Sequence, residues 1–272
     1  MAKNQMALKD DPALPAYVNP EQRGRGADLS AQNAPTPRIK VIQSNSGSDL
    51  RKTFGEGAII LAVGSEDAAD NVLLHQTDGE PFVGITLHYH PSYEARNDVN
   101  DTASFMIHAR TTDSESPLAM RCMKEDESRH ERYGDSNRFL RRYDVMHNFI
   151  LLIDSGPTAG KVGLLTYTGR YNRSAKNLNK LISGRADRGV SIYMNRVAFK
   201  SLLVKDPPKE WYVADHNNAS PAFIPTERVG VCAKMHEHLE ALYLAGKLNT
   251  TEPDDKKPVG AGVPVHEEDI PF

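Results

Sequence analysis

The sequence predicts a mainly β protein, built as an antiparallel barrel or sandwich with appended helices. Short apolar or alternating runs, bounded by turn residues, recur through the middle of the chain. A regular helix does not alternate with these runs, which argues against a parallel βαβ sheet. Amphipathic helical spacing is confined to two segments. With 272 residues, the chain is long enough for one large domain or two small ones.

Both ends of the chain are expected to lack a packed core. Residues 1–49 carry prolines among Gly, Ser, Asn and charged residues, and only Ile39–Ile42 looks strand-like. The last residues are similarly rich in Pro and Gly. Such compositions bury too little apolar area to offset the entropy of ordering. We therefore predict a flexible N-terminal arm (1–49), a core (50–247), and a disordered linker with an acidic tail (248–272).

Seven strands are predicted between these ends. They are Ala58–Val63, Phe82–His90, Ala103–Arg110, Leu140–Ile153, Lys161–Thr168, Val190–Val204 and Trp211–Asp215. The second ends at Pro91, and the fourth is long enough for a bent strand or for two strands with a corner. Gly156–Lys161 resembles a phosphate loop only loosely, because it is one residue short and lacks the final Ser or Thr, so we interpret it as a turn.

Two helices are predicted. In Asn172–Ile182, with Asn172 as N-cap, helical spacing separates a basic face from an apolar face. The basic face carries Arg173, Lys176 and Lys180, and the apolar face carries Ala175, Leu178 and Ile182. The second helix covers about Glu227–Ala245, with Thr226 as N-cap and Gly246 as its stop.

The net charge of -3 conceals a strong separation of charge along the chain. Residues 63–137 hold six basic and fifteen acidic residues, which gives -9. Residues 138–200 hold twelve basic and three acidic residues, which gives +9, and residues 251–272 hold two and six, which gives -4. A basic block in an otherwise acidic protein indicates a phosphate-binding surface.

Aromatic residues are interleaved with the cations of this basic block. Single-stranded nucleic acid needs both, because cations follow its backbone and flat rings stack on its bases. About half of these aromatics are expected to be core, with Phe149 and Phe199 foremost because apolar residues flank them. For phosphate contacts we predict Arg141, Arg142, Arg170, Arg173, Lys176, Lys180 and Arg196, and for stacking Tyr143, Tyr167, Tyr171 and Tyr193.

The sequence offers no positive sign of an enzyme, a metal site or a cofactor. His88 with His90 and His236 with His238 form close pairs, but neither pair has the spacing of a zinc motif. The carboxylates Glu125, Asp126, Glu127 and Glu131 lie in a run broken by cations, as on an exposed loop or helix. Apolar runs are too short for a membrane span or a signal peptide, so a cytoplasmic location is expected.

The C-terminus, His266–Phe272, reads HEEDIPF behind a Pro/Gly linker. Ile270 and Phe272 can fill a small apolar pocket, while Pro271 limits the entropy lost on docking. The three acidic residues before them steer the tip towards a basic rim.

This terminus resembles the tip of bacterial single-stranded DNA-binding proteins, which binds replication and repair proteins and competes with DNA for the basic groove. The resemblance implies that Glu267, Glu268, Asp269, Ile270, Pro271 and Phe272 bind partner proteins. The body is similar to divergent phage-encoded single-stranded DNA-binding proteins in Gly163–Ile182 and Val190–Tyr212. That resemblance implies an elaborated OB-fold-like β-barrel and a role in DNA replication, recombination and repair inside the bacterial host.

The resulting expectation is a non-enzymatic protein that binds single-stranded DNA with little sequence preference and recruits partners through its tail. A homo-oligomer is compatible with it. Three alternatives remain open: a strand-annealing or recombination-mediator protein, a nuclease that uses the acidic block, and a structural or host-interaction protein.

Overall fold

The computed structural model describes residues 36–62, 71–96, 107–128, 143–206, 209–216, 222–246 and 248. The protein is mainly β, as predicted. Its described residues form two compact units, one built from residues up to His90 and from His147 onward, the other from residues between Pro91 and Met146. Within the described ranges, no helix combines the length and apolar character needed to cross a membrane.

Ten strands and four α-helices are described. The strands are β1 (Arg38–Val41), β2 (Ile59–Ala62), β3 (Val72–His75), β4 (Phe82–Arg96), β5 (Ile107–Thr111), β6 (Tyr143–Ile153), β7 (Val162–Thr168), β8 (Asn195–Asp206), β9 (Lys209–His216) and β10 (Ala222–Phe223). The α-helices are α2 (Ser48–Phe54), α3 (Pro117–Ser128), α4 (Asn172–Ala186) and α5 (Thr226–Leu244). Short 3-10 turns are η4 (Gly156–Thr158), η5 (Gly169–Tyr171) and η6 (Ile192–Met194).

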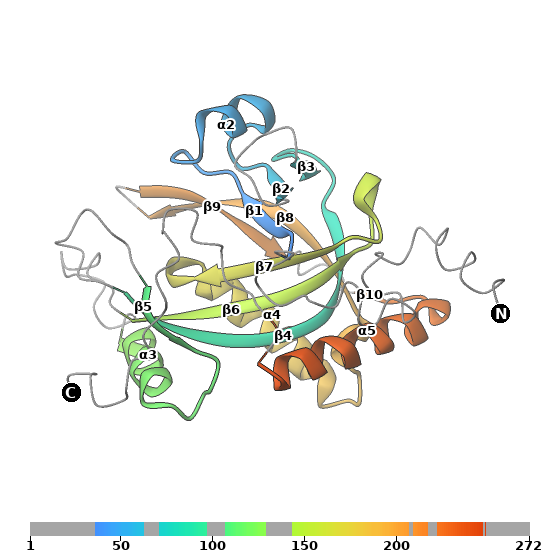
Figure 1. The fold of residues 1–272 in the computed structure, drawn as a ribbon. Helices are drawn as coiled ribbons and strands as arrows, with labels where there is room; N and C mark the ends of the chain where they lie inside the picture. Colours follow the sequence, from blue (N-terminus) through green and yellow to red (C-terminus); the bar gives the residue numbers. More distant parts are fainter. Residues whose placement is uncertain are drawn as a thin grey trace. The chain divides into compact units, whose positions relative to one another are not determined.

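The strands join in the order β10-β8-β4-β6-β7-β1-β2-β3, with β9 paired to β8 and β5 paired to β4 (Figure 1). β8 pairs antiparallel with both β4 and β9, whereas β1 pairs parallel with β7. The expectation of a purely antiparallel sheet was therefore wrong at β1, because this strand from the predicted arm enters the sheet beside β7.

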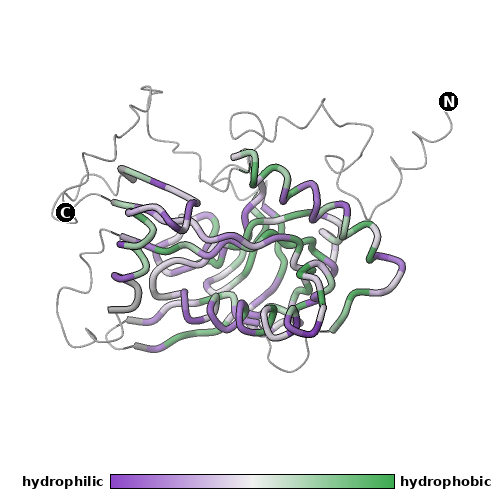
Figure 2. The backbone as a smooth tube through the Cα atoms, turned by 90° about the horizontal axis from the view of Figure 1, so that it is seen from below, coloured by the Kyte–Doolittle hydropathy of each residue, from purple (hydrophilic) through white to green (hydrophobic). Residues whose placement is uncertain are grey.

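In the larger unit, helices cover the apolar faces of the sheet. α4 places Ala175, Leu178 and Ile182 in a core with residues of β1, β2, β4 and β6–β9. α5 places Cys232, Met235 and Leu239 in a second core with residues of β4, β6 and β7. In Figure 2 the hydrophobic segments gather in the strands, while the helices alternate between hydrophobic and hydrophilic positions. The strands β4, β6 and β7 contribute residues to both cores, so these central strands are apolar on both faces.

The smaller unit is organised around α3 and the outer parts of β4 and β6. Leu118, Ala119 and Cys122 of α3 pack with Tyr93 and Val145. The fully buried carboxylate of Glu94 accepts a hydrogen bond from Arg110 Nε at 2.6 Å. A buried carboxylate needs such a partner, because an uncompensated charge is costly to remove from water.

A side chain links β9 to the chain just after β1 in the larger unit. Gln43 Nε2 donates to the Tyr212 carbonyl oxygen at 2.7 Å, and the Tyr212 N–H donates to Gln43 Oε1 at 2.9 Å. Gly57 lies close by with a φ of +81°, and a Cβ there would come within 2.7 Å of the Tyr212 ring. Because both bonds go to the backbone of Tyr212, the Gln43 side chain pairs with β9 in the way that the backbone of a neighbouring strand would. This contact stabilises the curl of the sheet.

Several predicted elements are confirmed. β6–β7 flank the predicted turn at η4, and α4 and α5 occupy their predicted positions, with Gly246 just beyond α5 at a φ of +65°. The predicted caps were wrong, since neither helix has a side-chain cap bond, and Asn172 and Thr226 are the first helical residues. The packed core begins at β1, earlier than residue 50. Residues 1–35 and 249–272 lie outside the described residues.

β4 runs further than predicted, and β8 begins at Asn195 rather than at the predicted Val190, because Ile192–Met194 forms the turn η6. β4 continues through Pro91 to Arg96, because Pro91 lies between the stretch paired with β8 and the stretch paired with β5, where a missing N–H is tolerated. β6 is one continuous strand, Tyr143–Ile153. α2 and α3 were not predicted as helices, and an OB topology is not established by this strand order.

We predict that Gln43→Ala lowers the free energy of unfolding by about 1–3 kcal/mol, because it removes both hydrogen bonds to Tyr212 and leaves two backbone groups unpaired. Urea denaturation of the full chain measures the change. Gln76→Ala is the matched control, since the Gln76 amide donates one exposed bond, to the Phe54 carbonyl. Equal losses in the two variants would contradict the special role of Gln43.

Candidate nucleic-acid interface

A groove of about 420 Å³ lies between the first turns of α4 and the β8–β9 hairpin, within the larger unit. Its size is within the range of about 300–1,000 Å³ that is typical of small-ligand sites. α4 contributes Arg173, Ser174 and Asn177, and the hairpin contributes Leu202, Leu203, Val204, Lys205, Trp211, Val213 and Asp215.

The register of the hairpin explains which of its side chains line this groove. Val204 is paired with Trp211, Leu202 with Val213, and Lys200 with Asp215. Directly paired residues project from the same face of a sheet. One face of the hairpin therefore presents an apolar floor that contains the only tryptophan of the chain, and its Leu202 is 42% exposed.

The predicted basic face of α4 borders the groove. Arg173, Lys176 and Lys180 are all exposed, while the opposite face of the helix is buried in the core. Arg173 lines the groove itself. Lys205 of β8 also borders it, but it pairs with Glu210 on the opposite face of the hairpin from Trp211, with its Nζ 3.6 Å from Glu210 Oε1. The arrangement combines cations with an aromatic ring, which is what binding of a single strand requires.

Tyr167 is not available for stacking. It is 2% exposed, and its hydroxyl donates to the Ala214 carbonyl oxygen at 2.7 Å. Burial also raises the pKa of its hydroxyl strongly. Phe149 and Phe199 are fully buried, as predicted. Tyr171, in the turn before α4, is half-buried and packs against the same core.

Two other predicted residues belong to the α5 side of the sheet rather than to the groove. Tyr193 packs against the second core, with its ring 5.4 Å from that of His236. Arg196 projects to Asp154, described below.

The remaining predicted residues are not brought to the groove by the described structure. Tyr143 is in the smaller unit, where the Arg121 guanidinium lies 4.3 Å from its ring centroid. Arg141, Arg142 and the whole tail Glu267–Phe272 lie outside the described residues, as does the side chain of Arg170. Of the four carboxylates in the run Glu125, Asp126, Glu127 and Glu131, only the side chain of Glu125, on α3, is described.

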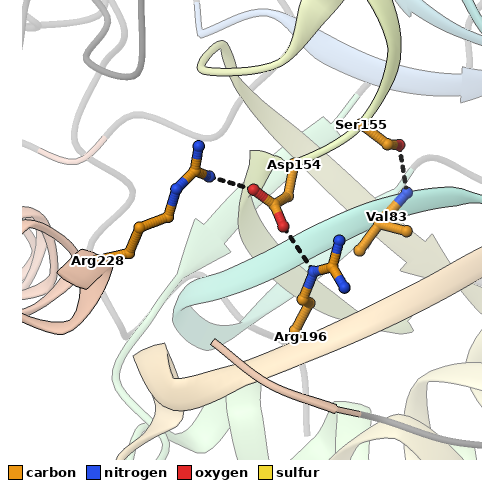
Figure 3. A network of polar contacts seen from close by, with 5 residues as sticks. All are labelled: Val83, Asp154, Ser155, Arg196 and Arg228. Carbon is orange, nitrogen blue, oxygen red and sulfur yellow. Dashed lines mark hydrogen bonds and ion pairs between the residues drawn. The ribbon is translucent and has the colours of Figure 1, made fainter. Parts of the chain in front are cut away.

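A buried carboxylate ties α5 to the sheet (Figure 3). Asp154 Oδ2 accepts from Arg196 Nε at 2.6 Å, and its Oδ1 is bonded by Arg228 from the start of α5. Next to it, the Val83 N–H donates to Ser155 Oγ at 2.8 Å. The Asp154 side chain is 8% exposed, so both guanidinium groups compensate a charge that water hardly reaches. Arg196 is thus committed to a structural ion pair.

The sequence interpretation missed Trp211, Leu202, Lys205 and Asp215 as groove residues. It identified Trp211–Asp215 as a strand, but not which face of that strand is open. The available signal was the hairpin itself, because a long alternating strand followed closely by a second strand predicts paired faces.

The predicted neighbours His88 and His90 do lie together, with ring centroids 5.5 Å apart, beneath α5. The His88 ring lies 6.1 Å from that of His236 and 5.3 Å from that of Tyr243. Burial, together with nearby His236, lowers the pKa of His88 to about 4. Burial, together with nearby His88, lowers the pKa of His90 to about 3. No group of three metal-binding side chains occurs among the described residues.

We predict that Asp154→Asn destabilises the protein by about 1–3 kcal/mol, because Arg196 and Arg228 lose their counter-ion. Arg196→Ala should also destabilise it, since it leaves Asp154 with one partner. Arg173→Ala on α4 is the matched control and should stay within about 0.5 kcal/mol of the wild type. Urea unfolding monitored by circular dichroism measures all three, and an equal loss in Arg173→Ala would contradict the assignment.

We also predict that acidification weakens the fold through His88 and His90. Because their pKa values are lower in the folded state than the usual 6.5, the unfolded chain binds more protons below that pH. Their contribution is complete above pH 6.5 and is lost as the pH falls towards 4. Between pH 7.5 and 5 the loss is about 2 kcal/mol for each histidine.

The slope of unfolding free energy against pH, measured by urea titration, checks this expectation. His90→Gln should reduce the slope over pH 5–6.5, and His88→Gln with His90→Gln should reduce it further. A slope unchanged in the double variant would show that other groups control the acid sensitivity.

In comparisons with protein-family models, curated proteins and solved structures, no match to this chain was found. The function of the groove is therefore inferred from its own chemistry.

Proposed function

We propose that this protein binds single-stranded DNA without enzymatic activity, and that the strand enters the groove between α4 and the β8–β9 hairpin. The mainly β core of the larger unit would act as an OB-fold-like platform for the strand. The single observation that carries the proposal is the meeting of Trp211 with Arg173 in one groove, beside the exposed cations Lys176 and Lys180 of α4.

The chemistry of the groove favours a single strand over a duplex. Bases that are not paired expose a flat face, and stacking of one base on an aromatic side chain contributes about 1–3 kcal/mol. Leu202, which is 42% exposed, extends the apolar surface beside Trp211, and Arg173 of α4 lines the same groove. Phosphates can contact this arginine while bases turn towards the ring.

The tail is the second part of the proposal. As its resemblance implies, Glu267–Phe272 would recruit replication and repair proteins. The charge of -4 in residues 251–272 is opposite to that of the α4 face, so the tail would compete with DNA when no partner holds it.

The test uses the only tryptophan of the chain as its own probe. Titration of the full-length protein with dT30 at 50 mM salt should quench Trp211 fluorescence, and anisotropy of labelled dT30 should rise in parallel. Affinity should fall steeply with added salt, because phosphate contacts release counter-ions. Absence of binding at 50 mM salt by both readouts would overturn the proposal.

Arg173→Ala with Lys176→Ala should weaken binding and reduce the log–log salt slope by roughly 1.4, or about 0.7 for each lost phosphate contact. Lys234→Ala is the matched control, because Lys234 is exposed on α5, which covers the other core. Trp211→Phe should abolish the fluorescence change while anisotropy still detects binding. An unchanged slope in the α4 double variant would place the DNA elsewhere.

A further inference from the structure

Asp215 is chemically out of place in a groove that attracts phosphates. Its side chain is 22% exposed, so it is mostly shielded from water yet reachable from the groove. A carboxylate only accepts hydrogen bonds and repels the backbone of a nucleic acid. Its one described ionic contact, Oδ1 to His216 Nδ1, is long at 3.8 Å and exists as an ion pair only when that histidine is charged.

We propose that Asp215 selects the base held in the groove, favouring bases that present an amino group over thymine and uracil. This inference rests on the proposed binding of single-stranded DNA. Under this inference, binding has little sequence preference except at the one position where a base meets Asp215.

The hydrogen-bonding pattern of the bases explains the direction of this preference. Cytosine presents an N4 amino group, which donates to a carboxylate. Uracil and thymine carry an O4 carbonyl in its place, and that oxygen would face the Asp215 carboxylate without any proton between them. The Watson–Crick edge of guanine has two adjacent donors, N1–H and N2–H, which suit a carboxylate equally well.

Neighbouring side chains complete the recognition. Asn177, from the next turn of α4, lines the same groove, and its amide can donate to N3 of cytosine, which carries a proton in uracil and cannot accept there. Trp211 supplies the stacking face. Lys200, paired with Asp215 across the ladder, provides an exposed cation for the adjoining phosphate. The groove thus has separate partners for the ring, edge and backbone of a nucleotide.

The experiment compares labelled dC30 with dU30 by fluorescence anisotropy at pH 7.5 and constant salt. These two oligomers differ in the 4-amino against the 4-oxo group and in the N3 proton, without the thymine methyl. The wild type should bind dC30 roughly fivefold to tenfold more tightly. Equal affinities would overturn this inference while leaving the proposed function intact, whereas no binding to either oligomer would overturn both.

Asp215→Asn assigns the preference to this residue, because an amide both donates and accepts and so discriminates poorly between the two bases. The ratio of affinities should fall below about twofold, while affinity for both oligomers rises as a negative charge is lost. Asp187→Asn is the matched control, since Asp187 is exposed at the end of α4, outside the groove, and should leave the ratio unchanged. A ratio in Asp215→Asn equal to that of the wild type would overturn the assignment.

Asn177→Ala provides a second test that does not depend on how well Asp215→Asn folds. Asn177 is exposed on α4, so its truncation should leave the fold intact. The dC30 preference should fall roughly twofold or more, because one donor to the cytosine edge is lost. A preference unaffected by this change would contradict the recognition of the base edge.

Discussion

The burial of one face of α4 in the curled sheet is the interaction on which the rest of the larger unit depends. Ala175, Leu178 and Ile182 share a core with strands from both ends of the unit. Because that face is inside, the cations on the opposite face must point to solvent. The same docking places the first turns of α4 over the β8–β9 hairpin, and so forms the groove. The packing of α4 on the sheet therefore sets both the direction of its cations and the position of the helix over the β8–β9 hairpin.

Two polar links hold the partners of this contact in place. The side-chain amide of Gln43 ties β9 to the chain after β1, and Asp154 ties Arg196 on β8 to Arg228 on α5. Each link satisfies groups that burial would otherwise leave unpaired. They act at different places, the first on β9 and the second between β8 and α5. The curl of the sheet and the cover over its second face are thus stabilised separately.

Local patterns predicted seven of the ten described strands and the helices α4 and α5, because their apolar runs are strong, but not β3, β10, α2 or α3. These patterns did not predict which side chains are exposed where both faces of a strand are buried. Leu164 belongs to one core and Leu165 to the other, so alternation along β7 could not show that Tyr167 points inward. Its nearness in sequence to Arg170 suggested an exposed ring. α3 was missed as a helix because its charged run is equally typical of a loop, and the open face of β9 depends on its pairing with β8 and on the cover provided by α4.

The cations of residues 138–200 do not all face solvent. The basic block contains both structural and exposed cations: Arg196 compensates Asp154, whereas Arg173 borders an open groove. A count of charges along the sequence adds these together and so overstates the surface left for phosphates. The groove itself is lined by Arg173, Lys205 and one carboxylate, and Lys205 is also paired with Glu210. Under the proposed function, Arg173 and the exposed Lys176 and Lys180 beside it would make the affinity depend on salt, whereas stacking against Trp211 and hydrogen bonds to a base edge would decide which bases are preferred. Specific contacts of this kind discriminate between bases, whereas charge alone does not.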